Sequence, residues 1–201
     1  MFIKSAICVS QIKLSVTLMI TLLFCSSCSS SNTTPFPSPQ RDFSASDLLI
    51  KLSALPGWEL KSAGVSELSS HAIGISHNLG GYQISFLKQG MADANHLVIQ
   101  FPSSDDAAKA YKSHHFTRNT TNTQWELLNG FAYASQIADQ FRVVCDTRAR
   151  LVASCIIEAQ YDEFLSVINY GGLNQSEVIS DLTLLANAVD SQVAKYIESG
   201  E

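Results

Sequence analysis

The stretch QFRVVCDTRARLVASCIIEAQYDEFLSVINY, residues 140–170, carries three apolar segments in quick succession. Residues 140–145, 151–159 and 164–170 are rich in β-branched and aromatic side chains, and the connections between them are short. Short connections between consecutive strands favour antiparallel neighbours. The stretch therefore predicts an antiparallel meander, around which the rest of the chain is organised.

Two cysteines lie on adjacent strands of this predicted meander. Cys145 alternates with Phe141 and Val143 on one strand, and Cys155 alternates with apolar residues on the next. A hairpin centred at 148–150 would place both sulfurs opposite each other on one face, so we expect a disulfide, which closes a loop of about eleven residues and contributes roughly 2 to 3 kcal/mol. The alternative, a reactive thiol pair, needs a cation or a helix N-terminus to lower the thiol pKa, and only nearby arginines offer one.

Further strands precede or begin the meander. The alternation of apolar residues predicts five of them, at residues 58–65, 82–86, 97–101, 125–128 and 131–137. We expect the second and third of these to pair as neighbours. Residues 66–81 are ambiguous, because His71, Ile73 and Ile75 alternate as in a strand, whereas the surrounding glycines and serines disfavour one.

Three capping signatures predict helices. Residues 44–47 precede a leucine-rich segment and predict one short amphipathic helix, residues 103–106 open a helix of about three turns, and residues 174–177 open a long C-terminal helix. Strands in runs, with helices at the ends and in the middle, predict an α+β fold. We expect a twisted antiparallel sheet of about six to eight strands with N-terminal, central and C-terminal helices packed on it.

The N-terminal residues have the layout of an export signal. Lys4 and Lys13 supply positive charge, residues 14–24 form an apolar core, and no acidic residue occurs before Asp42. The core is too short to span a bilayer as a helix, which takes about 20 apolar residues.

The sequence CSSC at residues 25–28 resembles the bacterial lipobox. Ser26 and Ser27 fill the two small positions before Cys28, while Cys25 stands where that family usually has leucine. The resemblance implies that Cys28 becomes the first mature residue and carries a diacylglyceryl thioether and an amide-linked acyl chain, for which we expect palmitate. Several acyl chains, at about 0.8 kcal/mol per buried methylene, make a firm membrane anchor.

This interpretation divides the chain into three parts. Residues 1–27 are the signal peptide of a lipoprotein, residues 28–42 form a Ser/Pro-rich tether, and residues 43–201 form a single domain. We expect the domain at the cell envelope, held to the cell membrane or outer membrane on the extracytoplasmic side. The alternative is an ordinary secretory signal cut near 29–31, which leaves a free secreted protein.

The charge of the mature chain limits its partners. Removal of Lys4 and Lys13 with the signal leaves 11 Lys and Arg against 18 Asp and Glu, a formal charge of −7. We therefore expect no nucleic-acid partner. The membrane, contacted through the N-terminal lipid, is the partner that the sequence indicates.

Several features together resemble extracytoplasmic sensor domains of bacterial receptor kinases and PsbP-like lipoproteins. They are the strand that ends at residues 98–101, the capped Ala-rich helix at 103–111, Trp125, the paired cysteines and the closing helix. Those domains are α/β sandwiches with a cleft, and most have no catalytic residues. The resemblance implies a binding domain and transfers no site residue.

No catalytic motif is present in the sequence. Residues 74–78, GISHN, come nearest to a nucleophile elbow, but they lack the closing glycine, so we expect Ser76 to be an ordinary loop or strand residue. Asp162 and Glu163 could work as an acid–base pair, but adjacent acids in a turn are more typical of a solvated loop.

The spacing of the histidines in the sequence does not support a metal site. The histidines could converge with Asp105 or Asp106, since imidazole and carboxylate suit zinc. The set comprises His71, His77, His96, His114 and His115. Their spacing matches no metal motif, so we expect no metal ligand, no cofactor and no catalytic residue.

Aromatic side chains on or beside the strands are the candidates for ligand binding. We single out Trp58, Tyr82, Trp125 and Tyr133. A sheet face without a helix would expose some of them, although general burial tendencies favour the alternative that they fill the core. We expect a noncatalytic domain that binds a small apolar ligand or an envelope protein through its sheet face or a sheet–helix cleft. The alternatives are an envelope hydrolase or metal-dependent enzyme, whose site assembles from distant residues, and a purely structural role.

Overall fold

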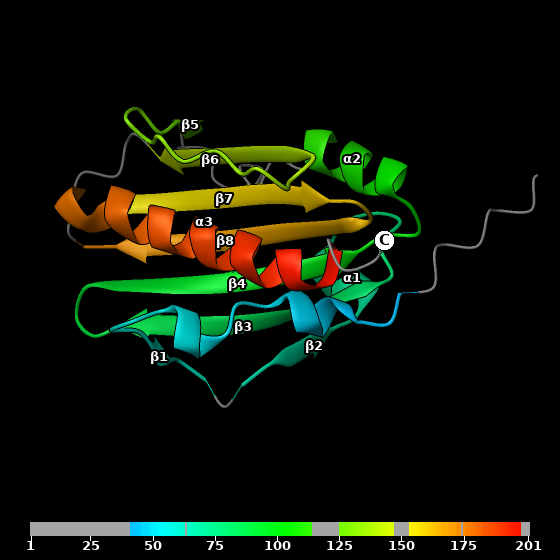
Figure 1. Cartoon of the computed structure of the whole chain (residues 1–201), viewed down its shortest axis with the longest axis horizontal. Helices are drawn as coiled ribbons and strands as arrows, with labels where there is room; N and C mark the ends of the chain where they lie inside the picture. The colour runs from blue at the N-terminus through cyan, green and yellow to red at the C-terminus, as the bar shows by residue number, and fades with distance from the viewer. Residues whose placement is uncertain (1–40, 63, 114–124, 147–152, 174, 198–201) are drawn as a thin grey trace, which may run out of the picture. The chain divides into compact units, whose positions relative to one another are not determined.

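The computed structural model describes residues 41–62, 64–113, 125–146, 153–173 and 175–197, of which residues 175 and 176 are described by backbone only (Figure 1). The predicted lipidation site Cys28, His114, His115 and the turn at 148–150 lie outside these ranges. The described residues belong to one compact unit. Within the described ranges, no helix is long and apolar enough to cross a membrane.

An eight-stranded sheet forms the centre of the domain (Figure 1). Its strands are β1 (Glu59–Leu60), β2 (Ser66–Leu68), β3 (Gly80–Lys88), β4 (Ala92–Gln100), β5 (Trp125–Leu127), β6 (Gln140–Asp146), β7 (Ala153–Tyr161) and β8 (Phe164–Gly172). They lie in the order β1-β3-β4-β8-β7-β6-β5, with β2 also on β3, and every neighbouring pair is antiparallel. The predicted α+β class, the antiparallel strands of residues 140–170 and the pairing of the predicted strands at 82–86 and 97–101 as neighbours are confirmed.

Helices cover the sheet on both faces. They are the 3-10 helices η1 (Ala45–Leu48) and η2 (Leu52–Ala54), and the α-helices α1 (Ser70–Ile73), α2 (Ser104–Ser113) and α3 (Gln175–Ile197). α3 lies over β7 and β8, and η1 lies over β3 and β4 (Figure 1). The predicted central and C-terminal helices are confirmed.

Alternation along the strands separates two core clusters. On β4, Ala94 and Val98 belong to the cluster that contains α3 and η1, while Leu97 and Ile99 pack with the cluster that contains α2. Because successive strand residues point to opposite faces, these clusters lie on opposite sides of the sheet. We call the side that carries α3 the α3 face and the other side the α2 face.

The single N-terminal helix predicted after residues 44–47 is wrong. The capping box itself forms, since the Ser44 backbone N–H donates to Asp47 Oδ2 at 2.9 Å. Leu49 then takes an extended conformation, and the Ile50 N–H donates to Nδ1 of His96 at 3.1 Å instead of continuing a helix. The buried imidazole therefore divides the segment into η1 and η2.

Two predicted strands also differ from the structure. Residues 131–137 form a loop, in which Phe131 and Tyr133 pack on the Phe141 ring and Tyr133 donates to Asp190 of α3. Among the described residues of the predicted strand at 58–65, Glu59–Leu60 form the short strand β1 on β3, and the ambiguous residues that follow contain β2 and α1. The apolar alternation of residues 131–137 therefore reflects packing on Phe141 and contact with α3, not pairing with a neighbouring strand.

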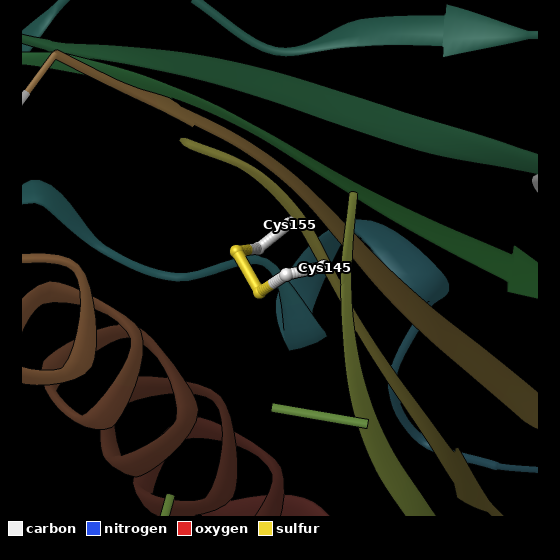
Figure 2. The surroundings of a disulfide bond; sticks show 2 residues. All are labelled: Cys145 and Cys155. Atoms are coloured by element: carbon white, nitrogen blue, oxygen red, sulfur yellow. A yellow bond between two sulfur atoms is a disulfide. The ribbon is translucent and has the colours of Figure 1, made fainter. Parts of the chain in front are cut away.

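The predicted disulfide is confirmed. Cys145 and Cys155 are directly opposite each other on β6 and β7, with a Cα–Cα distance of 4.0 Å. The sulfurs lie on the α3 face, between the strands and the helix (Figure 2). Because Cys155 is almost completely buried, the bridge is part of the core.

His96 links three elements in the interior. Its Nδ1 accepts from Ile50, which assigns the ring proton to Nε2, 2.9 Å from Ser166 Oγ on β8. Burial lowers the pKa of His96 from 6.5 to about 3. The neutral imidazole is therefore the form that the fold requires.

We predict that stability falls as the pH drops from 6.5 towards 3. Between these pH values His96 binds a proton in the unfolded chain but stays neutral in the folded chain. Its protonation therefore lowers the free energy of unfolding by at most about 1.4 kcal/mol per pH unit. Urea unfolding at pH 7 and pH 4.5 measures the loss. The His96→Asn variant keeps an acceptor for Ile50 and should lose less stability over this range; an equal loss in both proteins would contradict the assignment.

We predict that the Cys145→Ala/Cys155→Ala variant loses about 2 to 3 kcal/mol of unfolding free energy, because the bridge restricts the unfolded chain. Urea denaturation at pH 7 measures this loss. Dithiothreitol should shift the native protein to the same midpoint and leave the variant unchanged. Equal midpoints for the oxidised protein and the variant would show that the bridge adds no stability.

Candidate binding site

The four aromatic residues predicted to bind a ligand do not meet on one surface. Trp58 is buried in the cluster of the α3 face, and Tyr82 and Tyr133 pack against that same cluster. Trp125 packs against the cluster of the α2 face. Within the described chain, these side chains therefore contribute to two separate parts of the core, in agreement with the core-filling explanation.

A cavity of about 240 Å³ lies where the β3–β4 turn meets the end of β8. Its apolar walls come from Leu87, Met91, Ala92 and Leu173, and glycine backbone completes the lining. Met91 and Leu173 are 46% and 61% exposed, although both are large apolar side chains. The Leu173 N–H donates to the Met91 carbonyl at 2.8 Å, which fixes the two residues beside each other.

Gly171 and Gly172 help to keep this end of the sheet open. A Cβ on Gly171 would lie 2.7 Å from Asp93 Oδ1, the group directly across the strand pair. A Cβ on Gly172 would lie 2.3 Å from the Tyr170 hydroxyl. Neither position accepts a side chain without a shift of these neighbours, so the cavity floor is bare backbone.

One ion pair borders the cavity. Lys61 Nζ lies 2.7 Å from Asp93 Oδ2, and both side chains are about half exposed. An exposed pair of this kind contributes little to stability. It does leave the rim without net charge, so the cavity favours an apolar group over an ion.

A second cavity of about 240 Å³ separates α2 from the loop before β3. Ser76, His77, Asp106 and Lys109 line it. Asp106 accepts hydrogen bonds from Ser103 and Lys109, at 2.8 and 3.0 Å, and these bonds lower its pKa. Of the predicted histidine and aspartate set, the structure thus brings His77 and Asp106 to one cavity, and the described residues contain no group of three metal-ligating side chains.

The remaining charged side chains near the sheet ends hold elements together. Lys88 Nζ contacts Glu177 and Asp181 of α3 at 2.8 and 3.0 Å, and these hydrogen bonds raise the Lys88 pKa. Tyr170 donates to Asp181 at 3.1 Å. The Lys88 ammonium therefore serves as a fixed cation between β3 and α3.

Asp162 and Glu163, the candidate acid–base pair, both form ion pairs with Arg41. Arg41 Nε donates to Glu163 at 3.2 Å, and the same guanidinium pairs with Asp162. Glu163 is buried, whereas Asp162 is partly exposed. These carboxylates fasten the start of the described chain to the β7–β8 turn.

Sequence reasoning missed the residues that form the apolar cavity. Met91 and Leu173 lie in or beside turns, and Gly171 and Gly172 lie at the end of β8. The available signal was the combination of large apolar residues with adjacent glycines at predicted turns. The cavity also requires the pairing of β4 with β8, which local patterns do not reveal.

Comparisons with known proteins assign no family. The chain matches no family model and no curated protein. Among solved structures, the extracellular domain of PknH from Mycobacterium tuberculosis is similar at 13% identity and a TM-score of 0.40, with 68% of this chain and 81% of that chain covered. A likeness at this level assigns no activity.

We predict that Lys88→Met lowers the free energy of unfolding by about 2 kcal/mol, because it leaves the buried Asp181 carboxylate without its cation. Lys61→Met is the matched control, since it makes the same change in an exposed pair and should cost less than about 0.5 kcal/mol. Urea denaturation of both variants at pH 7 measures the difference. Equal losses would show that Lys88 has no structural role beyond that of an exposed lysine.

Proposed function

We propose that this chain is a lipid-anchored, extracytoplasmic, noncatalytic domain that binds an apolar group of a ligand or partner protein. The observation that carries the proposal is the open apolar cavity between Met91 and Leu173. Exposed apolar side chains around a cavity are typical of binding surfaces. Methionine suits such a site because its flexible thioether adapts to the shape of what it contacts.

Two observations support the extracytoplasmic location. The Cys145–Cys155 disulfide belongs to the core, and disulfides of this kind persist in oxidising compartments. The N-terminal residues have the layout of an export signal, and the lipobox resemblance adds an anchor at Cys28. Both point to the cell envelope.

The position of the cavity also fits an anchored binding domain. The described chain begins at Arg41, beside the β7–β8 turn, whereas the cavity lies at the opposite end of β8. β8 has nine residues and spans roughly 26 Å at about 3.3 Å per residue. The cavity therefore lies far from the point where the proposed tether joins the domain, and is accessible to a partner in the aqueous envelope space.

The noncatalytic part of the proposal draws support from the state of the titratable groups. His96 is buried and neutral, and the Lys88 pKa is raised rather than lowered. Burial, together with hydrogen bonds to Asp190, raises the pKa values of Tyr133 and Tyr161 above their ordinary values. None of these changes activates a nucleophile or a general base near neutral pH.

We predict that the protein isolated from membranes begins at Cys28 and carries acyl chains. Intact mass spectrometry of the native protein and of Cys28→Ala measures this directly. The native mass should equal residues 28–201 plus the lipid, and the lipid mass should disappear in the variant. An unmodified chain starting at residue 29 or later would overturn the anchor, and the domain would then be a free secreted binder.

A further inference from the structure

We propose that the apolar cavity and an adjoining row of polar side chains form one recognition site for an extended segment of a partner protein. The row consists of Ser85 on β3, Asn95 on β4 and Asn169 on β8, all on the α2 face. One apolar side chain of the segment enters the cavity, and the row binds its peptide groups. This inference rests on the proposed function and names the partner of that same cavity.

Strand register places the row beside the cavity. Ser85 is opposite Asn95, and Asn95 is opposite Asn169. The next residues on the same face, Asp93 and Gly171, are also opposite each other and line the cavity. Residues two apart on one strand lie about 7 Å from each other, which is the spacing of alternate residues in an extended peptide.

The row is accessible for binding. α2 packs at the other end of this face, over the cluster that contains Ile99 and Leu165. Asn169 is exposed, and Ser85 and Asn95 are half-buried. Ser85 donates to Asn95 Oδ1 at 3.5 Å, a bond in which the Asn95 amino group takes no part.

The chemistry of the row matches a peptide group. An asparagine amide offers one acceptor and two donor hydrogens, so it can bind a peptide C=O and N–H. β4 and β8 are paired on both sides, so their backbone groups are already used within the sheet. A partner segment must therefore be bound through side chains rather than by adding a strand.

Volume and charge favour a side chain over a free ligand or an ionic surface. A cavity of about 240 Å³ is smaller than the range of roughly 300 to 1,000 Å³ typical of small-molecule sites. It accommodates one large apolar side chain. The row carries no charge, and Lys61 and Asp93 compensate each other at the rim.

The test uses the full chain in lipid nanodiscs and a phage-displayed library of random 12-residue peptides. We expect enriched peptides to share one Leu, Ile, Met or Phe. Leu173→Ser removes part of the rim, and Gly171→Val fills the floor at the cost of moving Asp93 from its exposed contact with Lys61. Each variant should weaken peptide binding at least tenfold.

The matched control is Leu127→Ser, which makes the same substitution at a residue that is 70% exposed on β5. It should leave binding unchanged, and unfolding midpoints establish that all three variants fold. Absence of enriched peptides, or equal binding by native protein and Gly171→Val, would overturn the inference. If decanoate instead bound to the native protein and not to Gly171→Val, a free apolar ligand would replace the peptide while the proposed function remained.

Discussion

The pairing of β4 with β8 is the constraint on which the rest of the structure depends. Residues 92–100 and 164–172 are far apart in the sequence, and their nine paired positions join the N-terminal strands to the C-terminal meander. Contacts of such sequence separation carry a high loop-closure cost during folding. Burial of Val98, Phe164 and Ile168 in the α3-face cluster offsets that cost, because each side chain leaves water only when both halves are in place.

The register between β4 and β8 determines which side chains of β4 lie on each face of the sheet. A shift by one residue would move every side chain of β4 to the other face. His96 would leave the interior, where it joins Ile50 to Ser166, and Asn95 would enter it. The fixed register thus places a buried polar link, His96, and a half-buried member of the polar row, Asn95, on adjacent residues of β4.

The sequence predicted the elements with strong local signals. The meander, the disulfide and two helices followed from apolar periodicity, cysteine placement and caps, all of which act over a few residues. The loop at 131–137 and the divided N-terminal helix did not follow, because a tertiary partner decides each. Tyr133 binds Asp190 of α3, and Ile50 binds His96 of β4.

The candidate site was harder to predict, for a different physical reason. Sequence reasoning sought large aromatic side chains, but their area favours burial as strongly as binding, and Trp58 is in the core. The cavity depends on residues without side chains and on a cross-strand neighbour, Asp93, that is 78 residues away from Gly171 in the sequence. The local propensity of glycine indicates only that a strand ends. The register between β4 and β8 is needed to show that the absent side chain leaves space beside Asp93.

Gly172 couples the stability of the domain to the open cavity. The Tyr170 hydroxyl occupies the place where a Cβ on Gly172 would lie, and it donates from there to the buried Asp181 carboxylate. Asp181 in turn accepts from Lys88, so β3, β8 and α3 meet in one polar cluster. Buried polar clusters tolerate little loss, because each removed partner leaves another group unsatisfied. A side chain at Gly172 would therefore displace the tyrosine that completes the cluster. Because Gly172 also lines the cavity, the same bare backbone serves both the packing of α3 and the open end of the sheet.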